Sequence, residues 1–368
     1  MSNPRDSNSK MAAKEIVQFY RHLQETALST FLPILQQHLP HSNPIYNRLQ
    51  APHNLPSRHC LFAATFPPPA PGSSISVPEV YTILFSDRSR RAESQVWIFN
   101  NLTTLPSPLP TSQQNILNTH VHSAVVYLRE TEIPEAPGWP FDQRLRFSCL
   151  HDSITNSLTQ LLETRGGIPY ITKWNFWIVP TSTVSSKPRR PLPPGYSVSR
   201  VPEDQLDIVV STSSIPREPS TLKGQANVGI MDSEGKLAAW GYLGIDGSLA
   251  TLYVLPEHRG KGLATQVAVE LLSRYERGEF ADMGYAGRSG YVHSDVKVGN
   301  KESEGVMKSI GAEVRGTSSY LHVDSDRFSG YVHSMVKAGN GGSEGVMKSL
   351  GGSIEGQGNK VFVDSNKF

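Results

Sequence analysis

Residues 251–264 predict a strand, a glycine-containing loop and a helix in direct succession, and this order constrains the fold more than any other stretch. The β-forming residues 252–254 predict a strand, and Pro256 ends it because proline lacks a ladder donor and fixes its own φ. Gly260 and Gly262 allow the backbone to approach a ligand with no Cβ in the way. From residue 263 onward, apolar side chains recur at helical spacing: Leu263, Val267 and Leu271.

This loop is suited to a phosphorylated ligand. A loop that leads into a helix N-terminus presents unpaired N–H groups and the positive end of the helix dipole. Arg259 and Lys261 add positive charge at the same place. The sequence therefore predicts a phosphate-binding site here.

Other phosphate-binding loops fit the sequence less well. A Walker loop needs Gly, four residues and then Gly-Lys-Ser/Thr, an order that this chain lacks. A dinucleotide-binding fingerprint would have Thr265 in place of its third glycine and Asp282 as its acidic residue, and it also needs a βαβ unit. The residues upstream instead predict antiparallel hairpins. A solvated basic turn before an amphipathic helix remains an alternative.

Length and composition favour a two-domain protein in a reducing compartment. The chain has 368 residues, and its net charge of +2 with 18% charged residues gives no strong field for nucleic acid. Cys60 and Cys149 lie far apart and form no ligand spacing, and residues 1–10 contain no apolar leader. No run is long enough to span a membrane. We therefore expect a soluble, cytoplasmic protein, while the oligomeric state stays open.

A Pro- and Ser-rich segment over residues 179–195 predicts an extended linker between two domains. We expect disorder over residues 1–10, an N-terminal α/β lobe over 11–178 and a second domain over 196–328. Within the N-terminal lobe, the patterns predict helices over 16–31 and 150–164, and strands over 81–85, 96–99, 123–128 and 174–178.

The sequence of the second domain predicts an antiparallel meander whose last strand leads into the phosphate loop. Its strands are expected over residues 196–201, 226–231, 237–245 and 248–254, with a helix after the first of them. The dipeptide Asp246-Gly247 is typical of a type I′ hairpin turn. Further along the chain, the patterns predict a strand over 291–296, a helix that begins at Asn300 and a hairpin over 313–323.

Two motifs carry a resemblance to a known family. The phosphate loop resembles the acyl-CoA pyrophosphate loop of the GNAT superfamily of acyl-CoA N-acyltransferases in the pattern Val254-x-Pro256-x-x-Arg259-Gly260-x-Gly262-x-Ala264. The stretch around Trp240 and Asp246 is similar to the C-terminal half of glycine N-acyltransferase-like proteins, which also carry an extra N-terminal lobe. The resemblance covers residues 196–328. It implies an α+β GNAT fold, with a mixed, mostly antiparallel sheet flanked by helices and an N-terminal α/β lobe.

The resemblance also implies a co-substrate and its contacts. The co-substrate would be acyl-CoA or acetyl-CoA, with no metal, and the acceptor would be the primary amine of a small molecule or amino acid. A main-chain N–H near Tyr253 or Val254 would meet the thioester carbonyl, and Asn300 and Ser303 would meet the pantetheine arm. The acceptor pocket would be lined by residues 215–225 and the N-terminal lobe. The pyrophosphate would contact the N–H groups of Arg259, Gly260, Lys261, Gly262, Leu263 and Ala264.

The general acid and base depart from the family pattern. Met307 stands where many GNAT enzymes carry a tyrosine, and Ser248 stands where glycine N-acyltransferases are expected to carry a carboxylate. The candidates for the base are Asp246, His293 and Asp295, each of which also has a structural interpretation as a turn or strand residue. An acyl-CoA-binding or interaction protein without catalytic activity is therefore an alternative.

The C-terminal part of the chain is an internal duplication. Residues 289–328 and 329–368 align without gaps at a period of 40, with 23 identities. We expect the first copy to lie beside the strand that ends at Val254, because it follows the long helix directly and needs the shorter closing loop. In the second copy, Met335 replaces Asp295.

Overall fold

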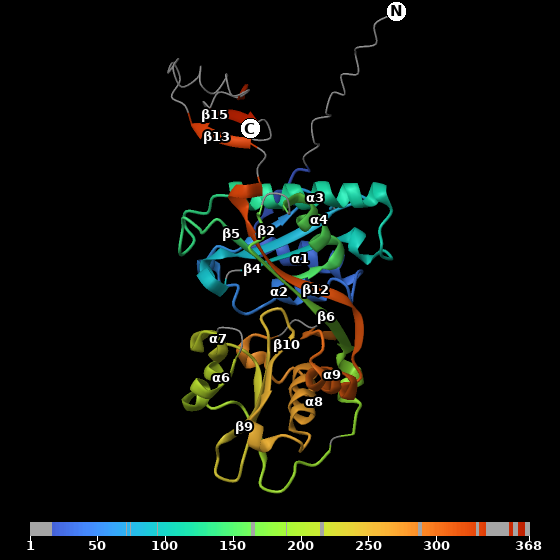
Figure 1. The fold of residues 1–368 in the computed structure, drawn as a ribbon, viewed down its shortest axis with the longest axis vertical. Coiled ribbons are helices and arrows are strands. Elements are labelled where there is room, and N and C mark those ends of the chain that lie inside the picture. Colours follow the sequence, from blue (N-terminus) through green and yellow to red (C-terminus); the bar gives the residue numbers. More distant parts are fainter. Residues whose placement is uncertain are drawn as a thin grey trace, which may run out of the picture.

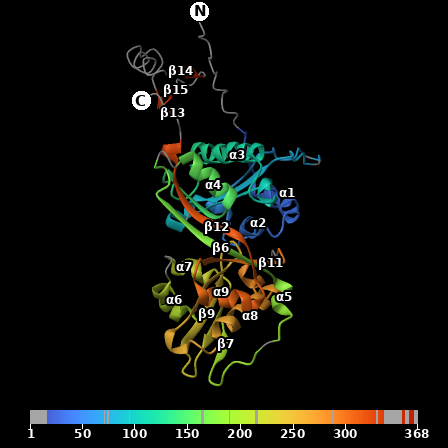
Figure 2. The same cartoon turned by 45° about the vertical axis from the view of Figure 1, so that its right-hand side comes forward.

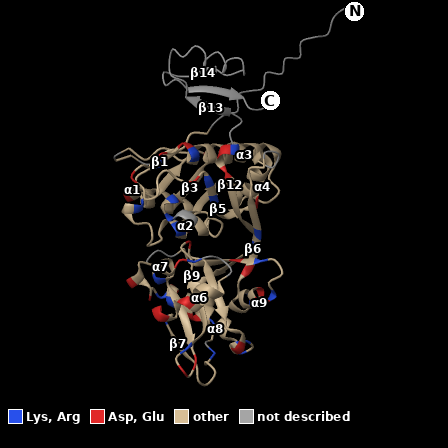
Figure 3. Cartoon of the chain, turned by 60° about the vertical axis from the view of Figure 1, so that its left-hand side comes forward, with Lys and Arg blue, Asp and Glu red and all other residues tan. Residues whose placement is uncertain are grey.

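The computed structural model describes residues 17–70, 72–73, 75–93, 95–162, 166–188, 190–213, 217–285 and 289–328, with the backbone of three short strands beyond them. The chain forms two lobes that are stacked along its long axis and joined by long strands (Figure 1). The region of residues 1–10, where disorder was expected, lies outside the described residues. Basic and acidic residues are interspersed over both lobes (Figure 3), in keeping with the net charge of +2.

The N-terminal lobe is a sheet covered by helices on both faces. Along β3 the side chains alternate, so that Leu84 packs towards α3 and α4 while Ile83 and Phe85 pack towards α1 and α2. Figure 2 shows α3 and α4 on one side of the sheet and α1 and α2 on the other. The elements are β1 (Tyr20–His22), α1 (Gln24–Gln36), α2 (Asn43–Leu49), β2 (Leu61–Ala64), β3 (Thr82–Asp87), β4 (Gln95–Asn100), α3 (Thr111–Glu130), β5 (Arg144–His151), α4 (Asp152–Leu162) and β6 (Tyr170–Pro180).

The large sheet contains strands from both halves of the chain. Its order is β1-β2-β3-β4-β5-β12-β6-β11, where β11 is Tyr291–Lys297 and β12 is Glu313–Asp324. The β4–β5 pair is parallel and the other pairs are antiparallel. Strand β12 lies between β5 and β6, and β6 lies between β12 and β11. Strands on either side of the expected linker therefore alternate within one sheet.

The second sheet belongs to the C-terminal half and has the order β10-β9-β8-β7. Helix α8 packs on β9, where Gly241 leaves room for the side chain of Val267. The elements are α5 (Thr181–Ser185), β7 (Ser197–Ser199), α6 (Leu206–Thr212), α7 (Pro219–Lys223), β8 (Asn227–Met231), β9 (Leu237–Leu243), β10 (Leu249–Val254), α8 (Leu263–Glu276) and α9 (Lys301–Ile310).

Two expectations for the N-terminal lobe are wrong. Residues 123–128, predicted as a strand, belong to α3, because Val121, Ala124 and Leu128 continue a helical stripe that packs against the sheet and overrides the β propensity of the valines. The helix predicted over 16–31 begins only at Gln24, after the short strand β1.

Two further expectations, in the C-terminal half, also differ from the structure. The hairpin predicted over 313–323 is the single strand β12, since Gly316, with a φ of 129°, lies where a bulge shifts the register against β6 and makes no turn. The expected linker over 179–195 begins with the end of β6 and with α5, whose Val184 is buried in the core beneath α8.

The first copy of the duplication contributes β11 and β12 to the large sheet, where β11 pairs with β6. It was expected beside β10, but β10 belongs to the other sheet and forms no ladder with β11. The described strands of the second copy, β13 (Tyr331–Met335), β14 (Ser353–Glu355) and β15 (Lys360–Asp364), pair with one another in a separate sheet. Among the described helices, none combines the length and the apolar character that crossing a bilayer requires.

Candidate functional site

The loop between β10 and α8 leaves the main-chain donors of its last three residues, 260–262, free. The N–H of Arg259, which was also expected to contact the pyrophosphate, instead donates to the carbonyl of Pro256 at 3.3 Å. Gly260 and Gly262 have φ values of 76° and 77°, which favour glycine, and an added Cβ on either residue would meet no atom within 4 Å. Gly262 caps α8, and the loop residues 259–262 are exposed. Within the described part of the chain, no hydrogen bond uses the N–H groups of residues 260–264. These amides therefore lie unpaired at the positive end of a helix.

Aromatic neighbours hold the two basic side chains of the loop. The guanidinium of Arg259 lies 5.6 Å from the ring centre of Tyr253 and donates to the carbonyl of Val254 at 3.1 Å. The ammonium of Lys261 donates to the hydroxyl of Tyr196 at 2.7 Å and lies 5.2 Å from the centre of its ring. Both charges are thus kept at the loop, where an anionic ligand would meet them.

Strands β10 and β11 are edge strands that separate next to this loop. They belong to different sheets and form no ladder with each other, although the hydroxyl of Ser294 donates to the carbonyl of Leu249 at 3.0 Å. Thr251 has a φ of 51°, which is rare for a β-branched residue, and it lies within a bulge between Ala250 and Tyr253. The edge of β10 that carries Tyr253 and Val254 therefore faces no paired strand.

The three base candidates come together where the lobes meet. Nε2 of His293 lies 3.6 Å from Oδ2 of Asp246, and Asp295 is two residues further along β11 on the same face. His293 and Asp246 are buried, whereas Asp295 is partly exposed. The turn before β10 therefore places Asp246 beside His293 on β11.

The turn that carries Asp246 is not the type I′ turn that its sequence suggested. Only Gly247, with a φ of 74°, adopts the left-handed conformation, and its N–H donates to the carbonyl of Gly244 at 2.9 Å. This corresponds to a type I turn followed by a glycine bulge. The Oγ of Ser248 donates to Oδ1 of Asp246 at 2.7 Å, so Ser248 supports a carboxylate two residues upstream.

The surroundings move the pKa values of these groups apart. Burial alone would raise the pKa of Asp246, but its contacts with His293 and Ser248 hold it below the ordinary value. Burial would lower the pKa of His293, but the carboxylate of Asp246 raises it above the ordinary value. Burial raises the pKa of Asp295, against the opposing effects of His293 and of two hydroxyl donors. Groups with such separated pKa values are typical of functional sites.

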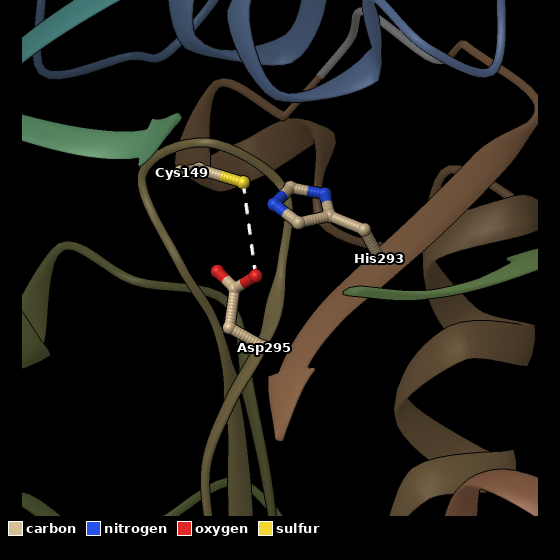
Figure 4. A group of neighbouring side chains, drawn as sticks. All are labelled: Cys149, His293 and Asp295. Atoms are coloured by element: carbon tan, nitrogen blue, oxygen red, sulfur yellow. Dashed lines mark hydrogen bonds between the residues drawn. The ribbon is translucent and has the colours of Figure 1, made fainter. Parts of the chain in front are cut away.

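Three residues that sequence reasoning missed complete the cluster. Nδ2 of Asn43, on α2, lies 3.0 Å from Nδ1 of His293. Sγ of Cys149, on β5, lies 3.8 Å from Oδ1 of Asp295, and the hydroxyl of Tyr320, on β12, donates to Oδ2 of Asp295 at 2.8 Å. Figure 4 shows the side chains of Cys149, His293 and Asp295 converging on one point. No local motif marks these residues, since the sheet order brings Cys149 and Tyr320 close to β11, and the packing of α2 brings Asn43 there.

The predicted pantetheine contacts lie apart from this cluster, on α9. Oδ1 of Asn300 accepts from the N–H of Ser303 at 3.1 Å, which caps the helix. Helix α9 lies against α8, and Oγ1 of Thr265 is 3.0 Å from Oγ of Ser309. Met307 is buried in the core, so this helix position offers no acid.

The segment expected to line an acceptor pocket contacts the N-terminal lobe. Within it, residues 215–216 lie outside the described residues, and α7 follows them. The hydroxyl of Thr221 donates to Glu93 at 2.7 Å and accepts from Arg90 at 3.0 Å. Helix α7 is therefore hydrogen-bonded to the N-terminal lobe through Thr221.

Comparisons with known proteins agree with this geometry. The family model of the acyl-CoA N-acyltransferase verG N-terminal domain matches residues 15–186, and the model of FR47-like protein matches residues 227–321. Together, the two matches cover both lobes. The chain belongs to the GNAT superfamily of acyl-CoA N-acyltransferases. A comparison with curated proteins finds no match.

Solved structures are also similar to this chain, and the first of them shares its fold over most of both chains. The crystal structure of a Drosophila protein matches with 14% identity and a TM-score of 0.57, over 83% of this chain and 98% of that one. A tandem GNAT protein from the clavulanic acid biosynthesis pathway matches with 11% identity and a TM-score of 0.44, over 84% and 98%. A GCN5-related N-acetyltransferase from Sphaerobacter thermophilus has 11% identity and a TM-score of 0.41, over 83% and 94%. The predicted α+β GNAT fold with an N-terminal lobe is confirmed.

Membership of the GNAT superfamily gives the co-substrate in general terms. Proteins of this superfamily use acyl-CoA, and the free amides between β10 and α8 fit its pyrophosphate.

Proposed function

We propose that this GNAT protein transfers an acyl group from acyl-CoA to the primary amine of a small molecule or amino acid. The observation that carries the proposal is the row of free N–H groups over residues 260–264 at the N-terminus of α8, next to the place where β10 and β11 separate. The amides and two basic side chains suit a diphosphate, and the separation of the strands suits the pantetheine arm that follows it.

In the proposed complex, main-chain groups hold the reacting thioester. The N–H of Tyr253 or Val254 would donate to the thioester carbonyl, whose oxygen gains negative charge during attack. Asn300 and Ser303 would contact the pantetheine from the start of α9. Because these donors are fixed before the substrate binds, they stabilise the charge without rearranging.

Proton transfer is assigned to the cluster on β11. The amine nitrogen forms a bond to the acyl carbon, the bond from that carbon to sulfur breaks, and the nitrogen loses a proton while the CoA thiolate gains one. Asp295 is the partly exposed one of the three base candidates and would be the group that an amine contacts. His293 and Asp246 lie buried behind it and would hold it in place or take the proton through water.

A charge placed on the phosphate loop tests co-substrate binding. The double substitution Gly260→Glu with Gly262→Glu should abolish CoA binding, measured by calorimetry, because two carboxylates would face the diphosphate. The matched control is Gly72→Glu with Gly235→Glu, two other glycines with φ values of 75° and open space around them. The control carries the same charge and the same backbone strain, so its affinity should stay at the wild-type value. Unchanged affinity in the loop variant would refute the assignment.

Catalysis is separated from simple binding by release of the CoA thiol. An enzyme should release thiol with at least one amine of a panel of amino acids and small primary amines. The buried Met307 at the position of the usual acid favours the second candidate function, an acyl-CoA-binding protein without catalytic activity. Binding of CoA with no thiol release from any amine would support that second function.

A further inference from the structure

Cys149, His293 and Asp295 form a compact set of metal-ligating groups. One ligand atom from each, the sulfur, a ring nitrogen and a carboxylate oxygen, lies within 4.8 Å of the other two (Figure 4). We propose that this cluster is a binding site for one divalent, thiol-binding cation such as Zn²⁺. Binding itself does not rest on the proposed acyl transfer.

The orientation of His293 points to a ligand. Its side chain is 0% exposed, and Nε2 has no hydrogen-bond partner among the described residues. This nitrogen faces the sulfur of Cys149 (Figure 4). The carboxylate of Asp246 lies beyond hydrogen-bond distance of this nitrogen, and a metal ion would supply the close partner that a buried ring nitrogen needs. Oδ2 of Asp246, 3.6 Å from Nε2, is available as a fourth ligand.

Two of the separations between ligand atoms suit a tetrahedral site. Zinc lies about 2.3 Å from a thiolate and about 2.0–2.2 Å from imidazole nitrogen or carboxylate oxygen, so neighbouring ligand atoms lie roughly 3.3–3.8 Å apart. Sγ of Cys149 is 3.8 Å from Oδ1 of Asp295, which falls within this range. The distance of 3.6 Å between His293 and Asp246 falls within it too.

Outer hydrogen bonds orient the ligands, as they do in metal sites. The hydroxyls of Ser318 and Tyr320 both donate to Asp295, and the amide of Asn43 holds Nδ1 of His293. A metal on Nε2 places the ring proton on Nδ1, so the amide of Asn43 must turn to offer its oxygen. The neighbouring Asn47 can turn with it, because its buried Oδ1 has no partner among the described residues.

Charge favours a cation over a covalent role for the cysteine. Two carboxylates are gathered around one imidazole, and an added positive charge would offset their burial. Burial, together with the carboxylate of Asp295, raises the pKa of the Cys149 thiol well above its ordinary value. Such a thiol is a poor nucleophile, whereas a bound metal ion deprotonates a coordinating thiol directly. Because His293 and Asp295 are also base candidates, a bound cation would block proton transfer from an amine.

Cobalt titration of the full chain tests the site. Co²⁺ added to metal-free, reduced protein should give a sulfur-to-cobalt charge-transfer band that saturates at one cation per chain, and Zn²⁺ should displace it. Cys149→Ser should remove the band, and Asp295→Asn should weaken Co²⁺ binding by more than about 100-fold, beyond the cost of losing an outer hydrogen bond. The control, Cys60→Ala, removes the other cysteine and should leave the band unchanged.

Two outcomes would overturn the assignment. One is the absence of a charge-transfer band in the wild-type chain at saturating Co²⁺. The other is a band of the same strength in folded Cys149→Ser, with folding checked by circular dichroism. The titration contains neither acyl-CoA nor amine, so a failure of the transfer reaction would leave its result unaffected.

Discussion

Nδ2 of Asn43 lies 3.0 Å from Nδ1 of His293, and this contact joins residues that are 250 positions apart in the chain. Asn43 opens α2 in the N-terminal lobe, and His293 lies on β11 from the C-terminal half. Oδ1 of the same amide accepts from Asn47 at 3.2 Å and from Ser289. One buried amide thus orients the imidazole from across the lobe interface.

Removal of this amide should weaken the interface. Asn43→Ala leaves Nδ1 of His293 and the amide of Asn47 buried without a partner. Each such group costs about 1–3 kcal/mol, so we expect the free energy of unfolding to fall by at least that amount. Urea denaturation measures the change. A loss below about 0.5 kcal/mol would show that the amide contributes nothing to the interface.

The close packing of α8 on β9 should be sensitive to a single methyl group. A Cβ on Gly241 would lie 2.8 Å from Cγ1 of Val267 and 3.3 Å from Cδ1 of Leu252. Gly241→Ala should therefore push α8 outward, lower the unfolding free energy by about 1–3 kcal/mol and weaken CoA binding. The matched control is Gly305→Ala in α9, where a Cβ meets nothing within 4 Å. It should instead stabilise the fold by about 0.5–1 kcal/mol. Equal effects at both positions would contradict this packing.

His120 should make the protein less stable in acid. Nδ1 of His120 lies 2.9 Å from Oγ1 of Thr82, and burial lowers the pKa of His120 to about 4. The unfolded chain, with a histidine pKa of about 6.5, binds this proton more readily, so the contribution of His120 is complete above about pH 6.5 and declines towards pH 4. The wild type should lose about 2 kcal/mol more than His120→Gln between pH 7 and pH 5. Denaturant titrations at both pH values measure this difference, and parallel losses in the two proteins would contradict it.

The second copy of the duplication should be dispensable for folding. Its described strands pair only with one another, so removal of residues 329–368 should change the unfolding free energy by less than about 0.5 kcal/mol. The complementary deletion, of residues 289–328, forces the second copy to complete the sheet. In that variant, Met335 takes the place of Asp295, and two glycines enter the start of α9. Each glycine should lower the unfolding free energy by about 1 kcal/mol. Equal stability of the two deletion variants would mean that the copies are interchangeable.

Local patterns in the sequence predicted the elements around the phosphate loop. Pro256, Gly260 and Gly262 determine the backbone conformation of only a few neighbouring residues. The order of strand, loop and helix could therefore be derived from them. The same is true of Asn300, which caps α9 as its spacing to Ser303 suggested. The fold of the second half followed from these signals together with the family resemblance.

The lobe interface could not be derived in this way. Cys149 and Asp295 meet because β5, β12, β6 and β11 lie side by side, and no local preference encodes that order. Residues 123–128 are a related case. Their valines favour a strand when only the local sequence is considered, but the apolar face of α3 packs against the sheet and makes them helical. The role of Asn43 likewise depends on the packing of α2 against β11.

The alternation of β5, β12, β6 and β11 also restricts how such a chain can be recombined. An exchange of halves with a related protein at residues 186–195 would take β5 and β6 from one parent and β11 and β12 from the other, and would set them alternately in one sheet. Every ladder among those strands would then join residues that had never been selected together. The smallest part that can be transplanted intact is therefore the whole unit from β1 to β12, and the connecting segment is a poor site for building chimaeras.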